Sequence, residues 1–164
     1  MKKIIQKDNP LLREKSKLVP PSDFGSPKLT KHLADMSEAL ASCHDGVALA
    51  APQIGLLLKI FIVSHKLFND ESTDDVVFIN PVVTKLSKKL KTLDEGCLSV
   101  RHVYGKIKRA EKATVEAYDE HGHKFSWNAS GLMAQIFQHE TDHLEGVLFI
   151  DKATDLTKDS HDLI

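Results

Sequence analysis

Apolar residues recur along this chain at two spacings, one typical of helices and one typical of strands. After a loop rich in Pro, Ser and Gly at 19–27, apolar residues return every three or four positions from 29 to 40. This spacing predicts one helix near residues 27–43 with a single apolar face. The same spacing returns from about residue 130 to 143, and Gly146 suits the end of this second helix.

Other segments are rich in β-branched and aromatic residues, which favour strands. These segments are 58–64, 76–79, 112–118 and 123–127. The turn from Asp119 to Gly122 suits a hairpin between the last two. We therefore predict an α+β fold in which β-sheets pack around a C-terminal helix, with one further helix near residues 27–43. The length of 164 residues fits a single catalytic domain over 1–164.

Charge and cysteine content narrow the class of protein. The chain has 22 basic and 23 acidic residues, so its net charge of -1 indicates neither DNA nor a membrane as a partner. Two cysteines are too few for a disulfide scaffold. The first apolar run stops at Ile5, and no stretch reaches the ~20 apolar residues of a membrane helix. We expect a cytoplasmic protein of bacterial type, or a mature chain inside an organelle.

The second predicted helix carries the sharpest chemical pattern, the segment HETDH at 139–143. His139 and His143 lie about one helical turn apart, so both imidazoles can bind one metal ion. Glu140 lies beside the first histidine and can reach a water molecule at that ion. The alternative is a solvated helix face with incidental histidines.

Two histidines need a third ligand, and the residues downstream do not supply one. Phe149 stands where one class of zinc peptidase has a further histidine, and no glutamate follows Glu145. We therefore look upstream, where Cys97 is a soft donor. A Cys/His/His set would leave a fourth tetrahedral position open for water or substrate. Taken alone, Cys97 also fits a small core residue.

A third segment, GVALAAPQIG at 46–55, combines small residues with one amide side chain. Gly and Ala allow another backbone to approach closely, and Gln53 offers an N–H donor in otherwise apolar surroundings. The alternative is a tightly packed strand and turn with a glutamine at the surface.

Together, three motifs resemble peptide deformylase: GVALAAPQ at 46–53, EGCLS at 95–99 and QHETDH at 138–143. They occur in the order and at the spacing of that family, and the resemblance covers nearly the whole chain. It implies an enzyme that removes the formyl group from the N-terminal methionine of new polypeptides. N-formylmethionyl peptides are then its substrates, and a transient contact with the ribosome is expected.

The resemblance also implies a site. Its metal ligands match Cys97, His139 and His143, its general acid/base matches Glu140, and its oxyanion donors match the Gln53 side chain and the Leu98 backbone N–H. The ion would be Fe2+ in the cell, although Zn2+, Ni2+ or Co2+ can occupy such a site. A hydroxide on the ion would attack the formyl carbon. We expect the peptide to bind as an added strand, with its methionine in an apolar pocket. The residues expected to contact it are Gly46, Val47, Ala48, Gly96, Leu132 and Ile136.

The chain departs from the family pattern at three positions: Ala48 replaces a glycine, Arg101 a proline and Gln135 an arginine. We expect a negative φ at Ala48, because the pattern at 47–51 is typical of extended chain.

Two other functions stay open: a zinc endopeptidase, and a relative that binds nascent N-termini without hydrolysing them. Lysines cluster at 85–91, either as a solvated strand or loop or as a contact to ribosomal RNA.

Overall fold

A computed structural model describes residues 1–69 and 71–158 of the chain. Two α-helices and eight strands make up its regular structure, with short 3-10 turns between them. The helices are α1 (Pro27–Ala41) and α2 (Gly131–Leu144). The strands are β1 (Ala48–Ala50), β2 (Ile60–Val63), β3 (Val76–Leu86), β4 (Leu90–Cys97), β5 (Val100–Ala110), β6 (Lys112–Tyr118), β7 (Lys124–Ser130) and β8 (Thr154–Lys158).

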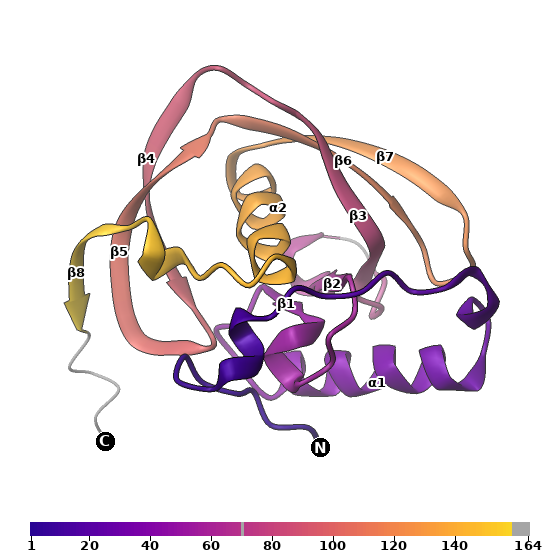
Figure 1. The fold of residues 1–164 in the computed structure, drawn as a ribbon. Coiled ribbons are helices and arrows are strands. Elements are labelled where there is room, and N and C mark those ends of the chain that lie inside the picture. The colour runs from indigo at the N-terminus through magenta and orange to yellow at the C-terminus, as the bar shows by residue number, and fades with distance from the viewer. Residues whose placement is uncertain (70, 159–164) are drawn as a thin grey trace.

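The strands form two antiparallel sheets, and α2 packs against both of them (Figure 1). One sheet has the order β1-β2-β3-β6-β7, and the other has the order β4-β5-β8. The predicted α+β class, with sheets packed around a C-terminal helix, is therefore confirmed. No described helix has both the length and the apolar character that crossing a membrane requires.

Strand β2 shows how the two helices share the larger sheet. Phe61 and Val63 belong to the core cluster that includes Ala134 and Phe137 of α2. Ile60 and Ile62 belong instead to the cluster formed with α1. Successive side chains of a strand point to opposite faces. The four buried apolar residues of β2 therefore pack against α2 on one face of the sheet and against α1 on the other.

Local chemistry explains where the helices begin and end. The Ser26 side chain accepts a hydrogen bond from the Leu29 N–H at 3.1 Å, and Pro27 occupies the first turn of α1. Helix α2 ends before Gly146, which has a φ of 75°. A Cβ at Gly146 would lie 2.5 Å from the Arg13 carbonyl oxygen, so both the turn and the packing favour glycine.

The structure confirms both predicted helices and the predicted hairpin turn, in which the Gly122 N–H donates to the Asp119 carbonyl. Strand β3 runs to Leu86, well beyond the predicted end at residue 79. The sequence pattern missed the strands β4, β5 and β8. These three strands carry many exposed polar side chains, so their composition resembles that of loops.

The long hairpin of β4 and β5 brings the EGCLS segment over α2. Gln138 of α2 holds this arrangement through both atoms of its side-chain amide. Its Oε1 accepts a hydrogen bond from the Ala110 N–H at 2.8 Å, and its Nε2 donates to the Ala110 carbonyl at 3.0 Å. The end of β5 is therefore fixed against the helix that carries both candidate histidine ligands.

Candidate metal centre and active site

Three side chains from two elements meet in a cluster with the composition of a metal centre. One ligand atom each from Cys97, His139 and His143 lies within 4.8 Å of the others. The Cys97 Sγ and the His143 Nε2 are 3.3 Å apart. One thiolate and two imidazoles are a donor set that suits a divalent transition metal and leaves a coordination position open. The three residues therefore fit one divalent metal ion.

A buried carboxylate orients the first histidine of this cluster. The His139 Nδ1 is 2.5 Å from Oε1 of Glu95, a residue that is only 6% exposed. Since this nitrogen is engaged, Nε2 is the atom left to bind a metal. A carboxylate behind a ligating histidine fixes the ring and its tautomer.

Glu95 itself receives four hydrogen-bond contacts from three side chains. Besides His139, the Arg109 Nη2 donates at 2.6 Å and the Arg109 Nε at 3.1 Å. The Gln135 Nε2 donates at 3.1 Å, and it also donates to the Asp94 carbonyl at 3.0 Å. Burial alone would raise the pKa of Glu95, but the bonds from His139 and Arg109 outweigh it and lower this pKa to about 2. Glu95 is therefore an ionised acceptor at neutral pH.

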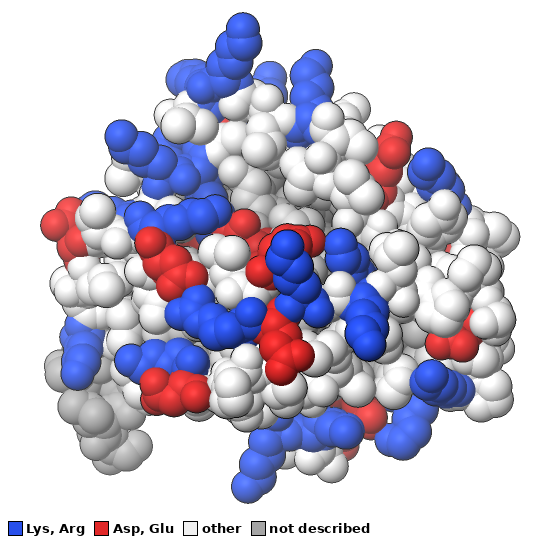
Figure 2. Space-filling view, in the orientation of Figure 1, with Lys and Arg blue, Asp and Glu red and all other residues white. Residues whose placement is uncertain are grey.

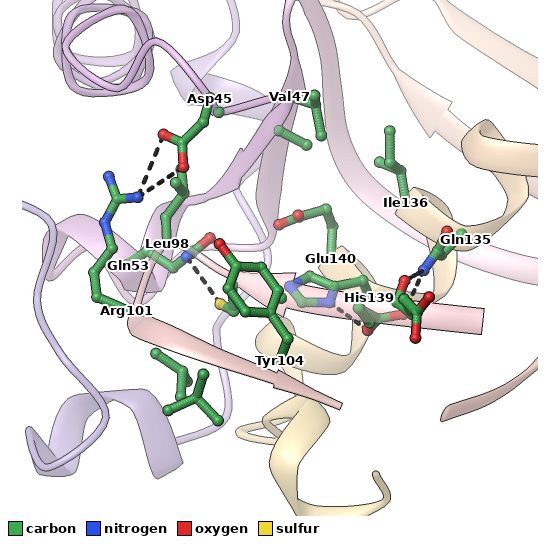
Figure 3. Close-up of a pocket in the computed structure, with 18 of the residues that line it drawn as sticks. Asp45, Val47, Gln53, Leu98, Arg101, Tyr104, Gln135, Ile136, His139 and Glu140 are labelled. Atoms are coloured by element: carbon green, nitrogen blue, oxygen red, sulfur yellow. Dashed lines mark hydrogen bonds and ion pairs between the residues drawn. The ribbon is translucent and has the colours of Figure 1, made fainter. Parts of the chain in front are cut away.

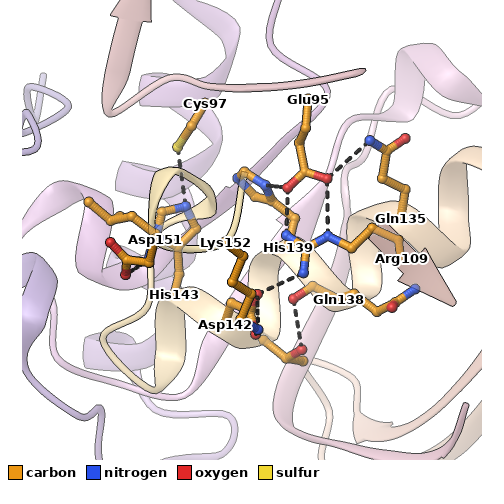
Figure 4. Close-up of polar contacts among 12 residues, drawn as sticks. Glu95, Cys97, Arg109, Gln135, Gln138, His139, Asp142, His143, Asp151 and Lys152 are labelled. Atoms are coloured by element: carbon orange, nitrogen blue, oxygen red, sulfur yellow. Dashed lines mark hydrogen bonds and ion pairs between the residues drawn. The ribbon is translucent and has the colours of Figure 1, made fainter. Parts of the chain in front are cut away.

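The buried Arg109 links Glu95 to the metal-binding helix (Figure 4). Its Nη1 donates to Asp142 of α2 at 2.8 Å, and Lys152 approaches the same carboxylate at 3.3 Å. The sequence pattern did not predict that Glu95, Arg109 and Asp142 support the metal ligands in this way. Glu95 and Asp142 lie inside the quoted motifs, which offered a signal, but Arg109 follows Lys108 and resembles an ordinary solvated side chain.

Glu140 lines the cavity beside the cluster and is 4% exposed (Figure 3). Its Oε2 has no hydrogen-bond partner among the described residues. Burial raises the pKa of Glu140 to about 7. A carboxylate with such a pKa can both accept and release a proton near neutral pH.

Gln53 is held with its amide nitrogen on the Cys97 side of the site. Its Oε1 accepts from the Ala50 N–H at 2.9 Å, and its Nε2 donates to the Ser99 Oγ at 3.0 Å. The same nitrogen lies 3.6 Å from the Cys97 Sγ. Gln53 is 1% exposed, so the alternative of a surface glutamine is wrong. The adjoining Leu98 lines the cavity, and its proposed role as an oxyanion donor stays a prediction.

A cavity of about 320 Å³ opens beside the cluster. Every predicted site residue except His143 lines it; His143 lies behind and reaches Cys97. The lining includes all six residues expected to contact a peptide: Gly46, Val47, Ala48, Gly96, Leu132 and Ile136. Ala48 of β1 pairs with Val63 of β2, and it is absent from the described non-glycine residues with positive φ, so its expected negative φ is confirmed.

The other two departures from the family pattern also lie at this cavity. Arg101 forms an ion pair with Asp45 at 3.0 Å, and its Nη2 donates to the Cys43 Sγ at 3.2 Å. This pair lies at the rim in Figure 3. Gln135 also lines the cavity, where it contacts Glu95 as described above. Arg101 therefore helps to form the wall of the cavity, whereas Gln135 supports the metal-binding cluster through its hydrogen bond to Glu95.

The fold and the site together define a metal-binding hydrolase. A sequence model of the family described as "Polypeptide deformylase" matches residues 1–159. Peptide deformylase 2 of Clostridium acetobutylicum is 35% identical over 158 residues, which cover 96% of this chain and 99% of that protein. The chloroplastic peptide deformylase 1B of Solanum lycopersicum is 36% identical over 158 residues, with 96% of this chain but only 55% of that protein covered.

Solved structures agree with this assignment. A crystal structure of a peptide deformylase from Legionella pneumophila has a TM-score of 0.84 at 34% identity and covers 94% of this chain and 87% of that one. Arabidopsis thaliana peptide deformylase 1B in complex with inhibitor 21 has a TM-score of 0.83 at 37% identity, with 93% and 82% covered. The chain belongs to the peptide deformylase family of enzymes.

Proposed function

We propose that this protein removes the N-formyl group from the N-terminal methionine of newly synthesised polypeptides and releases formate. The observation that carries the proposal is the Cys97, His139 and His143 cluster beside the buried carboxylate of Glu140. Membership of the deformylase family supports the same reaction.

Cys97, His139 and His143 would hold one divalent ion, which would acidify a water molecule and polarise the formyl carbonyl. Glu140 accepts the proton that this water loses. It then donates that proton to the amine nitrogen as the C–N bond of the formamide breaks. The buried position of Glu140 supports both steps, because its raised pKa brings the protonated and ionised forms close in energy.

Negative charge grows on the formyl oxygen as its carbon becomes tetrahedral. We assign the Gln53 side-chain N–H and the Leu98 backbone N–H to this oxygen. Gln53 suits the role because its amide is already held by Ala50 and Ser99 and needs no reordering. Loss of one such donor typically costs about 3–4 kcal/mol in transition-state binding.

The peptide would bind as an extended strand between Val47 and Gly96. Among the described strands, β1 lies at the edge of its sheet and pairs only with β2, so one of its sides is available for an added strand. Val47, Leu132 and Ile136 would form the methionine pocket. Val47 is 36% exposed and Leu132 is 50% exposed, so both present apolar surface for a substrate to cover.

The finer assignments belong to the same proposal. We assign Fe2+ as the ion in the cell, with Zn2+, Ni2+ or Co2+ as possible replacements, and a location in the cytoplasm or inside an organelle. We also propose that residues 1–164 form one catalytic domain, of which 159–164 lie outside the described residues. The chain spans 55% of the length of its tomato relative and 99% of the length of its Clostridium relative. The activity of the whole protein is therefore part of what we propose.

One assay separates this function from its rivals. The metal-loaded protein is given formyl-Met-Ala, acetyl-Met-Ala and an unblocked peptide, and formate and new amino groups are measured. We expect formate from the first peptide only. Cleavage of internal bonds would instead identify an endopeptidase, and binding without formate release would identify a non-hydrolysing relative. Parallel anaerobic samples with Fe2+ and Zn2+ test the metal, with faster and air-sensitive turnover expected for Fe2+.

A further inference from the structure

A second groove lies at the end of the larger sheet, outside the site described above. It occupies about 560 Å³ where β3, β6 and β7 meet the β3–β4 turn. Cross-strand pairing brings its polar residues together, because Lys85 pairs with Thr114 and Lys112 pairs with Ser130. The polar side chains that line it are Lys85, Ser87, Lys112, Thr114, Asn128 and Ser130.

Positive charge is concentrated around this groove, although the whole chain carries a net charge of -1. The β3–β4 turn and the start of β4 add Lys88, Lys89 and Lys91. Glu111 balances part of this charge, since it lies 3.2 Å from Lys89 and 3.2 Å from Lys91. Within the described part of the chain, none of Lys85, Lys88 and Lys112 forms an ion pair. Figure 2 shows the same concentration of lysine and arginine over the end where β3 and β4 meet in Figure 1.

Three of the neutral polar side chains at the groove, those of Ser87, Thr114 and Asn128, are held by hydrogen bonds. The Thr114 Oγ1 donates to the Asn128 Oδ1 at 2.7 Å, so the amide nitrogen of Asn128 is turned away from Thr114. Ser87 ties the turn together, because its Oγ accepts from the Lys112 N–H at 3.0 Å and donates to the Lys89 carbonyl at 2.9 Å. The groove therefore combines cationic side chains with neutral donors held by the sheet.

We propose that this groove binds the sugar–phosphate backbone of RNA. Lysines supply the attraction to phosphates, and the Asn128 amide and the Ser130 hydroxyl supply partners for phosphate oxygens and ribose 2′-hydroxyls. No aromatic side chain among the described residues lines the groove, so base stacking is not part of the proposed recognition. The concave polar floor argues against a lipid surface, although Leu86 and Leu90 on the same turn are 50% and 56% exposed.

Strand β4 connects the turn beside the groove to the candidate active site. Strand β4 runs from Lys91 near the groove to Cys97 in the metal cluster. Six residues of extended chain span about 20 Å. RNA held at the groove would thus lie about two nanometres from the site where a nascent N-terminus would bind. This relation to the nascent chain rests on the proposed function. The binding itself does not depend on that function.

The test measures fluorescence anisotropy of a labelled single-stranded RNA of about 20 nucleotides with the metal-loaded, full-length protein. The triple variant Lys85→Gln, Lys88→Gln, Lys112→Gln removes the three lysines around the groove that form no ion pair with any described residue. We expect at least a tenfold loss of affinity in it. Its slope of log K against log salt should also fall by about 2, since each phosphate contact to a single strand contributes about 0.7.

A matched control removes the same charge elsewhere: Lys2→Gln, Lys3→Gln and Lys15→Gln are exposed positions outside the groove. We expect the control to bind RNA within twofold of the unmodified protein. An equal loss in both variants would overturn the proposal, because the attraction would then be a property of the overall charge. Absence of binding at about 50 mM salt would overturn it as well.

Two competitors test the chemical class. Single-stranded DNA of the same sequence should bind at least threefold more weakly, and vesicles with anionic lipid should not displace the RNA. Equal affinity for DNA, or displacement by vesicles, would refute the assignment to RNA. Formate release from formyl-Met-Ala should be unchanged in both triple variants, and their thermal unfolding shows that they fold. A failure of the RNA proposal is thus distinguishable from a failure of the proposed function.

Discussion

Replacement of Arg109 by methionine tests whether the buried layer behind the metal ligands holds the site together. Arg109 is 4% exposed and bonds two carboxylates, Glu95 at 2.6 Å and Asp142 at 2.8 Å. Methionine retains much of the apolar stem but removes the guanidinium. Glu95 then keeps only His139 and Gln135 as donors, and it stays buried with an uncompensated charge.

The magnitude follows from this burial. Removing one partner of a buried ion pair typically costs about 3–5 kcal/mol, because the other charge is left without compensation. For a domain of this length, each kcal/mol lowers the melting temperature by about 2–4 °C, so we expect a fall of about 6–20 °C. Arg13→Met is the matched control. Its pair with Asp151 is 45% and 35% exposed, so its loss should cost only about 0–1 kcal/mol.

The assay is urea unfolding for the free energy and thermal unfolding for the melting temperature, with both variants and the unmodified protein measured in the presence of a chelator so that metal binding adds no stability. Metal affinity is measured separately by competition with a coloured chelator. We expect Arg109→Met also to weaken metal binding by about 10–100-fold, because Glu95, the carboxylate that orients His139, loses the two hydrogen bonds by which Arg109 holds it. If Arg109→Met is no less stable than Arg13→Met, the buried network does not support the fold as argued.

Four further changes test individual residues. Cys97→Ala should lose the spectroscopic metal–sulfur signal, and an unchanged signal would remove Cys97 from the ligand set. Glu140→Ala should keep the metal while turnover falls by about 10²–10⁴-fold, as is usual for a lost acid/base; near-normal turnover would contradict that role. Gln135→Met should weaken metal binding by up to about tenfold through Glu95, with titration by chelator as the measurement. Ala48→Gly should destabilise the fold by about 0.5–1 kcal/mol without a tenfold gain in kcat/KM, and such a gain would show that the alanine impairs the site.

The sequence by itself determined those features that depend on near neighbours in the chain. The spacing of His139 and His143 places both rings on one helix face wherever that helix packs. The segment predicted as a strand at 112–118 matches β6 at both ends. Cys97 could be selected as the third ligand because the downstream residues offered no suitable donor, and the family resemblance assigned the remaining site residues.

Tertiary structure alone decided which charged residues are buried. Arg109 directly follows Lys108 and is of a residue type usually found in solvent, yet it is 4% exposed. Its burial is tolerable only because Glu95 and Asp142, which are 14 and 33 positions away, receive its hydrogen bonds. Likewise, Lys85 and Lys112 share a groove only through the register of β3 and β6. Local periodicity reports which face of an element is apolar, whereas the compensation of a charge depends on partners that only folding brings together.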